Sequence, residues 1–431
     1  MNIVILGLSV TSSWGNGHAT TYRGLIRGLH ARGHSILFLE RDMPWYAGNR
    51  DQPGMAEARI QIYGSLSELI ERFQAQVRAA DLVIVGSFVP EGTAVGEWVT
   101  ATAHGVTAFY DIDTPVTLEQ LESGACDYLS LELVRRYRLY LSFTGGPVLR
   151  RIEQQYGAPM ARVLYCSVDP QLYYPEDRRE EYDLGYLGTY SVDRQPVLDR
   201  LLVEPARRWP EGRFAVTGPM YPDEIRWPPN VRREIHLEPK LHRGFFAAQR
   251  FTLNVTRAAM TSAGYSPSVR LFEAGACAVP VVSDYWNGLE TLFEPGRDIL
   301  LAESPDDTLR YLRDLPDSER RLIGQRARER VLAAHTPAHR AAQIEQYYEE
   351  ARKSRDNVLA DSPRGNGYGR PGSLRTDAGC SPERGRTAAG GRAGAAKGED
   401  SVGSDLQQSS GEGAGNVRAA GAGAKPADPG V

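Results

Sequence analysis

The chain has 431 residues, a length that suits two domains with additional segments. Hydrophobic residues make up 41% and charged residues 24%, as in ordinary soluble globular proteins. The formal net charge of -4 argues against a basic, nucleic-acid-binding chain. The cysteines, at positions 126, 166, 277 and 380, form no CxxC pair and no His/Cys cluster with metal-ligand spacing, so we expect reduced thiols.

The N-terminus predicts a buried strand rather than a targeting segment. Its apolar run, residues 3–6, is short and ends at Gly7, whereas a signal peptide needs a basic region and a longer apolar core. No stretch approaches the roughly 20 apolar residues of a membrane span. We therefore expect a cytoplasmic protein without a membrane-spanning segment.

In residues 1–175, short apolar runs alternate with stretches of helical spacing. Such alternation predicts a parallel sheet covered by helices on both faces. We expect strands at residues 3–6, 34–39, 81–86, 106–110, 139–143 and 163–166. The clearest helix covers residues 66–77, where Leu66, Leu69, Ile70, Phe73 and Val77 share one face.

A second unit of the same kind follows over residues 176–336, after a proline-marked boundary at residues 169–177. Its expected strands are residues 184–188, 213–218, 251–255 and 278–282. A last helix is expected at residues 337–354. Gly, Ala, Ser, Arg and Asp dominate residues 355–431, which we expect to be disordered because they cannot bury enough apolar surface. The predicted fold class is α/β, with two Rossmann-like domains and a disordered C-terminal tail.

The loop after the first strand contains Gly15, Gly17 and His18. Glycines at the start of a helix let backbone amides approach an anionic ligand. The loop is neither GxGxxG nor a P-loop, so the dinucleotide and Walker signatures are absent. We interpret Gly15 and Gly17 as cleft residues and His18 as a candidate general base. A packing turn and a capping histidine are the alternatives.

A second group of residues centres on Arg270 and Glu273. The Ser266-Pro267 pair is a good helix start, which would place Arg270 in the first turn and Glu273 on the same face. Arg270 and Ser268 could bind a diphosphate beside the helix amides, while Glu273 accepts hydrogen bonds from ribose hydroxyls. A simple Arg–Glu pair on a solvated helix is the alternative.

Three further positions follow predicted strands of the second unit: Thr189, Arg194 and Arg257. A cation at either arginine would face the bound diphosphate, and Thr189 could add a hydroxyl contact. Surface ion pairing is the alternative for both arginines.

The remaining candidates follow strands of the first unit. Asp111 and Asp113 lie on the same side of an extended segment, where they could bind acceptor hydroxyls or supply a catalytic base at Asp111. A helix cap or turn is the alternative. Thr144 and Gly145 follow the next strand and are expected to line the same cleft, by the rule that α/β sheets bind ligands at the carboxyl ends of their strands.

The run VRLFEAGACAVPVVSD, residues 269–284, resembles the donor-site helix of GT-B glycosyltransferases, in particular the branch related to the spore-maturation protein CgeB. Residues 286–290 and 294–300 continue the match. Residues 15–18, 111–115, 142–146 and 165–169 are similar to segments of the same group.

The resemblance implies two domains facing each other across a cleft, with the donor mainly on the C-terminal one. The helix at 337–354 would cross back to the N-terminal domain. It also implies a nucleotide-sugar co-substrate, an acceptor of unknown identity, and no metal, because basic side chains and helix dipoles stabilise the leaving diphosphate.

Two residues depart from the family pattern. The retaining branch often has two glutamates separated by seven residues; Glu273 matches the second, and Tyr265 stands at the first. Ala278 stands where a glycine is usual. Retention and inversion both remain open, as do a nucleotide-sugar epimerase and an inactive sugar-nucleotide or partner-binding protein. A dehydrogenase is disfavoured: Glu40 ends the second strand as a ribose-binding acid would, but the glycine fingerprint is absent.

Overall fold

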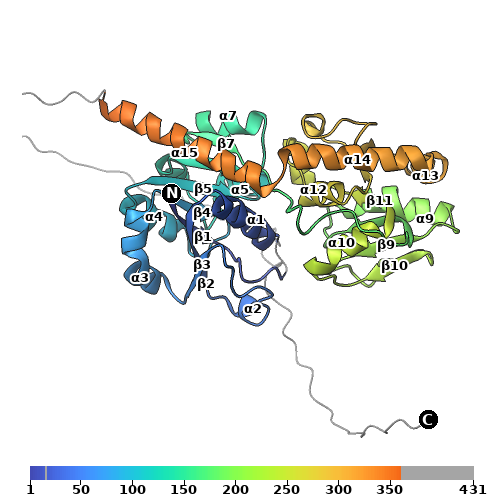
Figure 1. Ribbon diagram of the computed structural model, residues 1–431, viewed down its shortest axis with the longest axis horizontal. Coiled ribbons are helices and arrows are strands. Elements are labelled where there is room, and N and C mark those ends of the chain that lie inside the picture. The colour runs from blue at the N-terminus through green and yellow to red at the C-terminus, as the bar shows by residue number, and fades with distance from the viewer. Residues whose placement is uncertain (15–16, 361–431) are drawn as a thin grey trace, which may run out of the picture. The chain divides into compact units, whose positions relative to one another are not determined.

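The computed structural model describes residues 1–14 and 17–360, with side chains described up to residue 354 (Figure 1). Within these residues the chain forms two parallel β-sheets, each covered by helices. The last helix continues to Ala360, so residues 355–360, expected to be disordered, have a helical backbone. Gly15 and residues 361–431, which include most of the expected tail, lie outside the described residues.

The first sheet is parallel throughout and has the strand order β3-β2-β1-β4-β5-β6-β7. Its central strands β1, β4 and β5 are almost entirely buried, as expected for a sheet covered on both faces. The strands are β1 (Asn2–Gly7), β2 (Ser35–Arg41), β3 (Arg59–Tyr63), β4 (Leu82–Gly86), β5 (Val106–Asp111), β6 (Leu139–Ser142) and β7 (Ala161–Val163).

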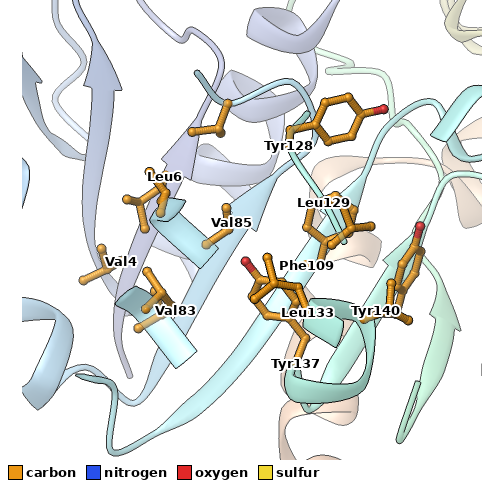
Figure 2. Close-up of a cluster of buried hydrophobic side chains, with 14 of the residues drawn as sticks. Val4, Leu6, Val83, Val85, Phe109, Tyr128, Leu129, Leu133, Tyr137 and Tyr140 are labelled. Carbon is orange, nitrogen blue, oxygen red and sulfur yellow. The ribbon is translucent and has the colours of Figure 1, made fainter. Parts of the chain in front are cut away.

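The helices associated with this sheet are α1 (His18–Ala31), α2 (Pro44–Ala47), α3 (Leu66–Ala79), α4 (Gly92–Thr102), α5 (Thr114–Ser123), α6 (Leu131–Arg136) and α7 (Pro147–Gln154). Alternate strand residues face two separate cores. Val4, Leu6 and Phe109 pack with residues of α3, α4 and α6, and Figure 2 shows part of this cluster. Ile3 and Ile5 face the other side, against α1 and the C-terminal helix α15 (Pro337–Ala360).

The second sheet is also parallel, with the order β10-β9-β8-β11-β12-β13. Its strands are β8 (Tyr182–Leu187), β9 (Phe214–Thr217), β10 (Val231–Glu234), β11 (Gln249–Asn254), β12 (Val281–Ser283) and β13 (Leu300–Leu301). The associated elements are α8 (Gln195–Leu198), η1 (Asp199–Val203), α9 (Glu204–Arg208), α10 (Pro239–Ala247), α11 (Ala258–Ala263), α12 (Val269–Ala276), η2 (Leu289–Thr291), α13 (Pro305–Asp314) and α14 (Asp317–Ala334).

Local sequence explains where several helices begin. The Ser65 hydroxyl accepts a hydrogen bond from the amide of Glu68 and caps α3, and Ser130 caps α6 in the same way. Ser304 and Asp307 form a reciprocal capping box at α13. These caps satisfy amides that have no partner within their own helix.

The structure adds strands that the sequence pattern did not indicate: β3, β10 and β13. The first two are the outer strands of their sheets, and most of their residues are only partly buried, so they lack the apolar run of a central strand. The third has two residues. Among residues 1–14 and 17–360, no helix is long and apolar enough to cross a bilayer.

Candidate active site

A cavity of about 790 Å³ opens where loops from both sheets converge. The loops after β1 and β2 of the first sheet contribute one wall, and the loops after β8, β9 and β10, with the start of α12, contribute the other. It is lined by Ser13, Trp14, Gly17, Thr20, Gly48, Asn49, Arg50, Asp51, Leu187, Gly188, Thr189, Gly218, Pro219, His236, Leu237, Glu238, Pro239, Lys240, His242, Val269, Arg270 and Glu273. Ligands of open α/β sheets bind at such carboxyl-terminal strand ends.

Arg270 is buried in the cavity wall and held in a fixed position. Its Nε donates to the carbonyl of Leu187 at 2.6 Å, its Nη1 donates to Oδ1 of Asn254 at 2.9 Å, and its guanidinium carbon lies 4.8 Å from the centre of the Tyr186 ring. In the part of the chain that the structure describes, no carboxylate forms a salt bridge with it. A preorganised cation that faces a cavity without an acidic partner suits an anionic ligand.

The glycine after β8, Gly188, leaves room for the Arg270 side chain. A Cβ atom at Gly188, directly after β8, would lie 2.9 Å from Nη2 of Arg270. Gly188 and Thr189 both line the cavity. Glycine therefore lets the backbone after β8 approach the guanidinium closely.

Helix α12 begins at Val269 with Ser268 as its N-cap, two residues later than the expected cap at Ser266. The Ser268 hydroxyl donates to Oδ1 of Asn254 at 2.7 Å, and no side-chain cap bond occupies the helix start. Arg270 still lies in the first turn, because the helix begins one residue before it. First-turn amides and the helix dipole both favour an anion here.

Glu273 lies one turn after Arg270, lines the cavity and is buried. It does not pair with Arg270. Burial raises the pKa of Tyr173 well above its ordinary value, and the charge of Glu273 and a hydrogen bond to it raise that pKa further. The tyrosine thus remains protonated and orients the Glu273 carboxylate.

The two other expected donor-site cations lie outside the cavity lining. Arg194 donates from Nη2 to the carbonyl of Thr189 at 2.7 Å, so it contacts the loop after β8 rather than the cavity. Arg257 is exposed at the start of α11. Its charge acts on Asp113, where burial raises the carboxyl pKa to about 6 and Arg257 opposes that rise.

His18 is the first residue of α1 and follows Gly17, which lines the cavity. His18 is itself buried, and its ring lies 5.6 Å from that of Phe88. Among the described residues its Nδ1 has no hydrogen-bond partner. Burial lowers its pKa to about 4, so the imidazole is neutral near pH 7. His18 itself is not among the residues that line the cavity.

Asp111 lies at the end of β5 but is fully buried and outside the cavity lining. Its carboxylate accepts hydrogen bonds from the hydroxyls of Tyr140 and Thr117 and from the amide of Asp113. Burial raises its pKa to about 6. These contacts favour the alternative of a turn that stabilises the start of α5, and they bring neither Asp111 nor Asp113 to the cavity.

Thr144 and Gly145 join the two halves of the fold instead of lining the cavity. Oγ1 of Thr144 lies 3.0 Å from Oγ of Ser266, and the amide of Gly145 donates to the carbonyl of Tyr265 at 2.9 Å. The Tyr265 ring packs against Gly146 and Gly288. Tyr265, at the position of the missing glutamate, therefore has a packing role at this junction.

Several lining residues were not singled out as site residues from the sequence. On the first sheet's side these are Ser13, Trp14, Thr20 and residues 48–51; on the second sheet's side they are Gly218, Pro219 and residues 236–242. Trp14 and Thr20 lie beside the candidate loop at residues 15–18, whereas the others belong to segments that match no motif and that only the folded chain brings together. Among the described residues, no cluster of three or more His, Cys, Asp and Glu side chains has the geometry of a metal site.

Comparisons with known proteins agree with this architecture. A family model described as glycosyl transferase-like matches residues 194–346. No curated protein matches the sequence significantly. Sucrose-phosphate synthase from Thermosynechococcus elongatus has a similar structure, with a TM-score of 0.59 and 16% identity, covering 82% of this chain and 100% of the synthase chain.

Two UDP complexes are similar as well. HepE from Anabaena in complex with UDP gives a TM-score of 0.60 at 14% identity and covers 81% of this chain and 100% of HepE. An α-glucosyltransferase in complex with UDP gives 0.54 at 14% identity, covering 84% and 100%. The chain therefore has the two-domain GT-B fold, and its residues 194–346 match a glycosyl transferase-like family.

Proposed function

We propose that this protein transfers a sugar from a nucleoside-diphosphate sugar to an acceptor hydroxyl. The observation that carries the proposal is Arg270: a buried guanidinium, fixed by neutral partners, at the start of a helix that faces a large cavity. A diphosphate supplies the anionic oxygens that this cation and the first-turn amides of α12 would bind.

The same groups would stabilise the reaction as well as the bound donor. When the glycosidic bond to the donor breaks, negative charge grows on the departing diphosphate, and preorganised positive groups lower the barrier to its departure. Since Arg270 and the helix start supply this charge, we propose that the reaction needs no metal. Glu273, oriented by Tyr173, would bind the ribose hydroxyls.

We keep His18 as the candidate base for an inverting reaction. It follows Gly17, which lines the cavity, and its imidazole is neutral at physiological pH, the form that a base requires. Asp111 is the weaker candidate because its carboxylate is already bonded within the first sheet. The CgeB-like branch stays a proposal based on the resemblance of residues 269–300.

UDP is the first nucleotide to test, because HepE and the α-glucosyltransferase are in complex with it. We expect calorimetry to show that the full chain binds UDP. Arg270→Ala should weaken that binding by about 10- to 100-fold, because it removes charge-assisted hydrogen bonds worth roughly 1.5–3 kcal/mol. Arg321→Ala is the matched control, since that arginine is exposed on α14 and pairs with Asp317. If Arg270→Ala and the wild type bind UDP with equal affinity, Arg270 does not bind the diphosphate.

A further inference from the structure

Asn254, the last residue of β11, is fully buried and hydrogen-bonds two residues of the proposed diphosphate site. Its Oδ1 accepts hydrogen bonds from Nη1 of Arg270 at 2.9 Å and from the hydroxyl of Ser268 at 2.7 Å. Ser268 is the N-cap of α12, and its side chain makes no cap bond to the amides of that helix. A single buried oxygen therefore holds both the guanidinium of Arg270 and the side chain of the N-cap residue.

The other end of the Asn254 amide bonds to two hydroxyl groups. Its Nδ2 donates to Oγ1 of Thr256 at 3.2 Å and to Oγ of Ser283 at 3.0 Å. Both hydroxyls donate their own hydrogens to Asp284: Thr256 to Oδ1 at 3.0 Å, and Ser283 to the carbonyl oxygen at 2.9 Å. A hydroxyl has one hydrogen to donate, so toward Asn254 each of them acts as an acceptor. The bonds to Asp284 therefore fix which end of the amide faces Arg270.

The carboxylate of Asp284 is itself buried and held in place by the same neighbours. The amide of Thr256 donates to its two oxygens, at 3.1 and 3.2 Å. Burial raises the pKa of Asp284 above its ordinary value, and the hydrogen bonds from Thr256 and Ser283 oppose that rise. Asp284 is thus connected to Arg270 through two hydroxyls and a neutral amide.

Asparagine suits this position because it accepts at one end of its side chain and donates at the other. A flipped amide would turn Nδ2 toward Arg270 and Ser268, which both donate here, and leave those buried donors without an acceptor. An aspartate would accept at both ends, and its charge would pair with the guanidinium. The neutral amide holds the cation without neutralising it.

We propose that Asn254, oriented by Asp284, is a positioning residue of the donor site: it fixes Arg270 and Ser268 and leaves the charge of Arg270 for the diphosphate. This inference rests on the proposed binding of a nucleoside diphosphate at Arg270. Neither Asn254 nor Asp284 lines the cavity, so both act through Arg270 and not by contact with the ligand.

The test measures UDP affinity by calorimetry on the full chain and follows the thermal unfolding of each variant. Asn254→Asp should weaken UDP binding about tenfold, because a carboxylate beside Nη1 pairs with Arg270 and competes with the diphosphate. Asn254→Ala removes the acceptor without adding a charge and should weaken binding about threefold. If Asn254→Asp is unfolded at the assay temperature, Asn254→Ala takes its place in every comparison.

A double variant separates positioning from general damage to the domain. Combined with Arg270→Ala, either Asn254 substitution should cause no further loss of UDP affinity, because Asn254 acts through the removed guanidinium. Asn230→Asp is the matched control. The Asn230 amide donates to three backbone carbonyls of the same domain and does not line the cavity. This substitution should lower the unfolding temperature and leave UDP affinity unchanged.

Two results would overturn the inference alone. In the first, Arg270→Ala weakens UDP binding but the Asn254 variants bind UDP as tightly as the wild type. In the second, the loss in the double variant equals the product of the two single losses, which shows that Asn254 acts independently of Arg270. If the wild type does not bind UDP, or Arg270→Ala binds it equally well, the proposed function fails and this inference fails with it.

Discussion

Ala278 adopts a left-handed backbone conformation, with φ at 57°, directly after the helix that carries Arg270. Its amide donates to the carbonyl of Gly275 and that of Val279 to Ala274, a pattern typical of helix C-termini. Glycine is the usual residue at such a position because a Cβ atom is strained there. The departure from the family pattern seen in the sequence is therefore a strained residue in the structure.

We predict that Ala278→Gly stabilises the protein by about 0.5–1 kcal/mol, since release of the left-handed strain outweighs the added freedom of the unfolded chain. Urea denaturation measures the free energy of unfolding. Ala276→Gly, at the last residue of α12, is the control and should destabilise by about 1 kcal/mol or more. Destabilisation by both variants would show that Ala278 is not strained.

At single residues, the sequence predicted Arg270, Glu273 and Thr189 as donor-binding residues and Gly17 as a cleft residue; all four line one cavity, and their binding roles stay predictions. It could not separate these from Asp111, which also ends a strand. The difference lies in the fold: Tyr140 and Thr117, from two other elements, hydrogen-bond the Asp111 carboxylate inside the domain. No spacing along the chain encodes those partners.

Among the helices, the packing of α15 on α1 joins the C-terminal segment to the first sheet (Figure 1). Two glycines of α1, one turn apart, face the start of α15. A Cβ atom at Gly28 would lie 2.3 Å from the carbonyl oxygen of Pro337, which is backbone and cannot rotate away. At Gly24 the nearest atoms, in Pro337 and Ser167, are 3.6 Å away, an ordinary contact distance.

We predict that Gly28→Ala destabilises the protein by about 1–3 kcal/mol, the usual cost of overpacking. Gly24→Ala is the matched control; it should be neutral or stabilise by up to about 1 kcal/mol, through better helix propensity. Thermal unfolding of both variants, compared with the wild type, measures the difference. Equal shifts in both variants would contradict the close approach of α15 to α1.

The central and edge strands of the two sheets differ in how well sequence patterns predict them. Buried central strands such as β4 have continuous apolar runs and were predicted, whereas β3 and β10 at the sheet edges have few buried residues and were not. The edge strands form because a neighbouring strand offers hydrogen-bonding partners in register, which is a property of the sheet.

For the molecule as a whole, Arg340 joins the two segments that connect the sheets. Its Nε donates to the carbonyl of Tyr165 at 2.8 Å and its Nη2 to that of Cys166 at 3.1 Å, in the segment that leads to the second sheet. Its Nη1 donates to the carbonyl of Ala334 at 3.2 Å, and its Nη2 lies 2.7 Å from Nδ1 of His335. Burial lowers the pKa of Arg340, and these neutral acceptors support its charge.

We predict that Arg340→Met lowers the free energy of unfolding by about 2–4 kcal/mol, because it leaves several buried acceptors without a donor. Guanidinium denaturation provides the measurement. Arg321→Met, at an exposed site of α14, should change the free energy of unfolding by less than about 0.5 kcal/mol. If Arg340→Met lowers the free energy of unfolding no more than Arg321→Met does, the hydrogen bonds of Arg340 do not stabilise the two segments that connect the sheets.

The fold class of the whole chain was predictable because alternating apolar strands and helices admit few topologies. The cavity was only half predictable. Its second-sheet wall includes the recognisable α12 start, and its first-sheet wall includes Gly17 of the candidate loop after β1. The lining residues 48–51, after β2, match no motif and meet that loop because β1 and β2 are adjacent.

A sugar-transfer assay tests the proposed function directly. The full chain is incubated with a panel of UDP-sugars and, as acceptors, the methyl glycosides of glucose, galactose, mannose and N-acetylglucosamine, and the products are identified by mass spectrometry. We predict a disaccharide glycoside and free UDP in the wild type, with both strongly reduced in Arg270→Ala and retained in Arg321→Ala. A wild-type protein that binds UDP and these sugars yet yields no disaccharide, or an isomerised nucleotide sugar formed without acceptor, would contradict it.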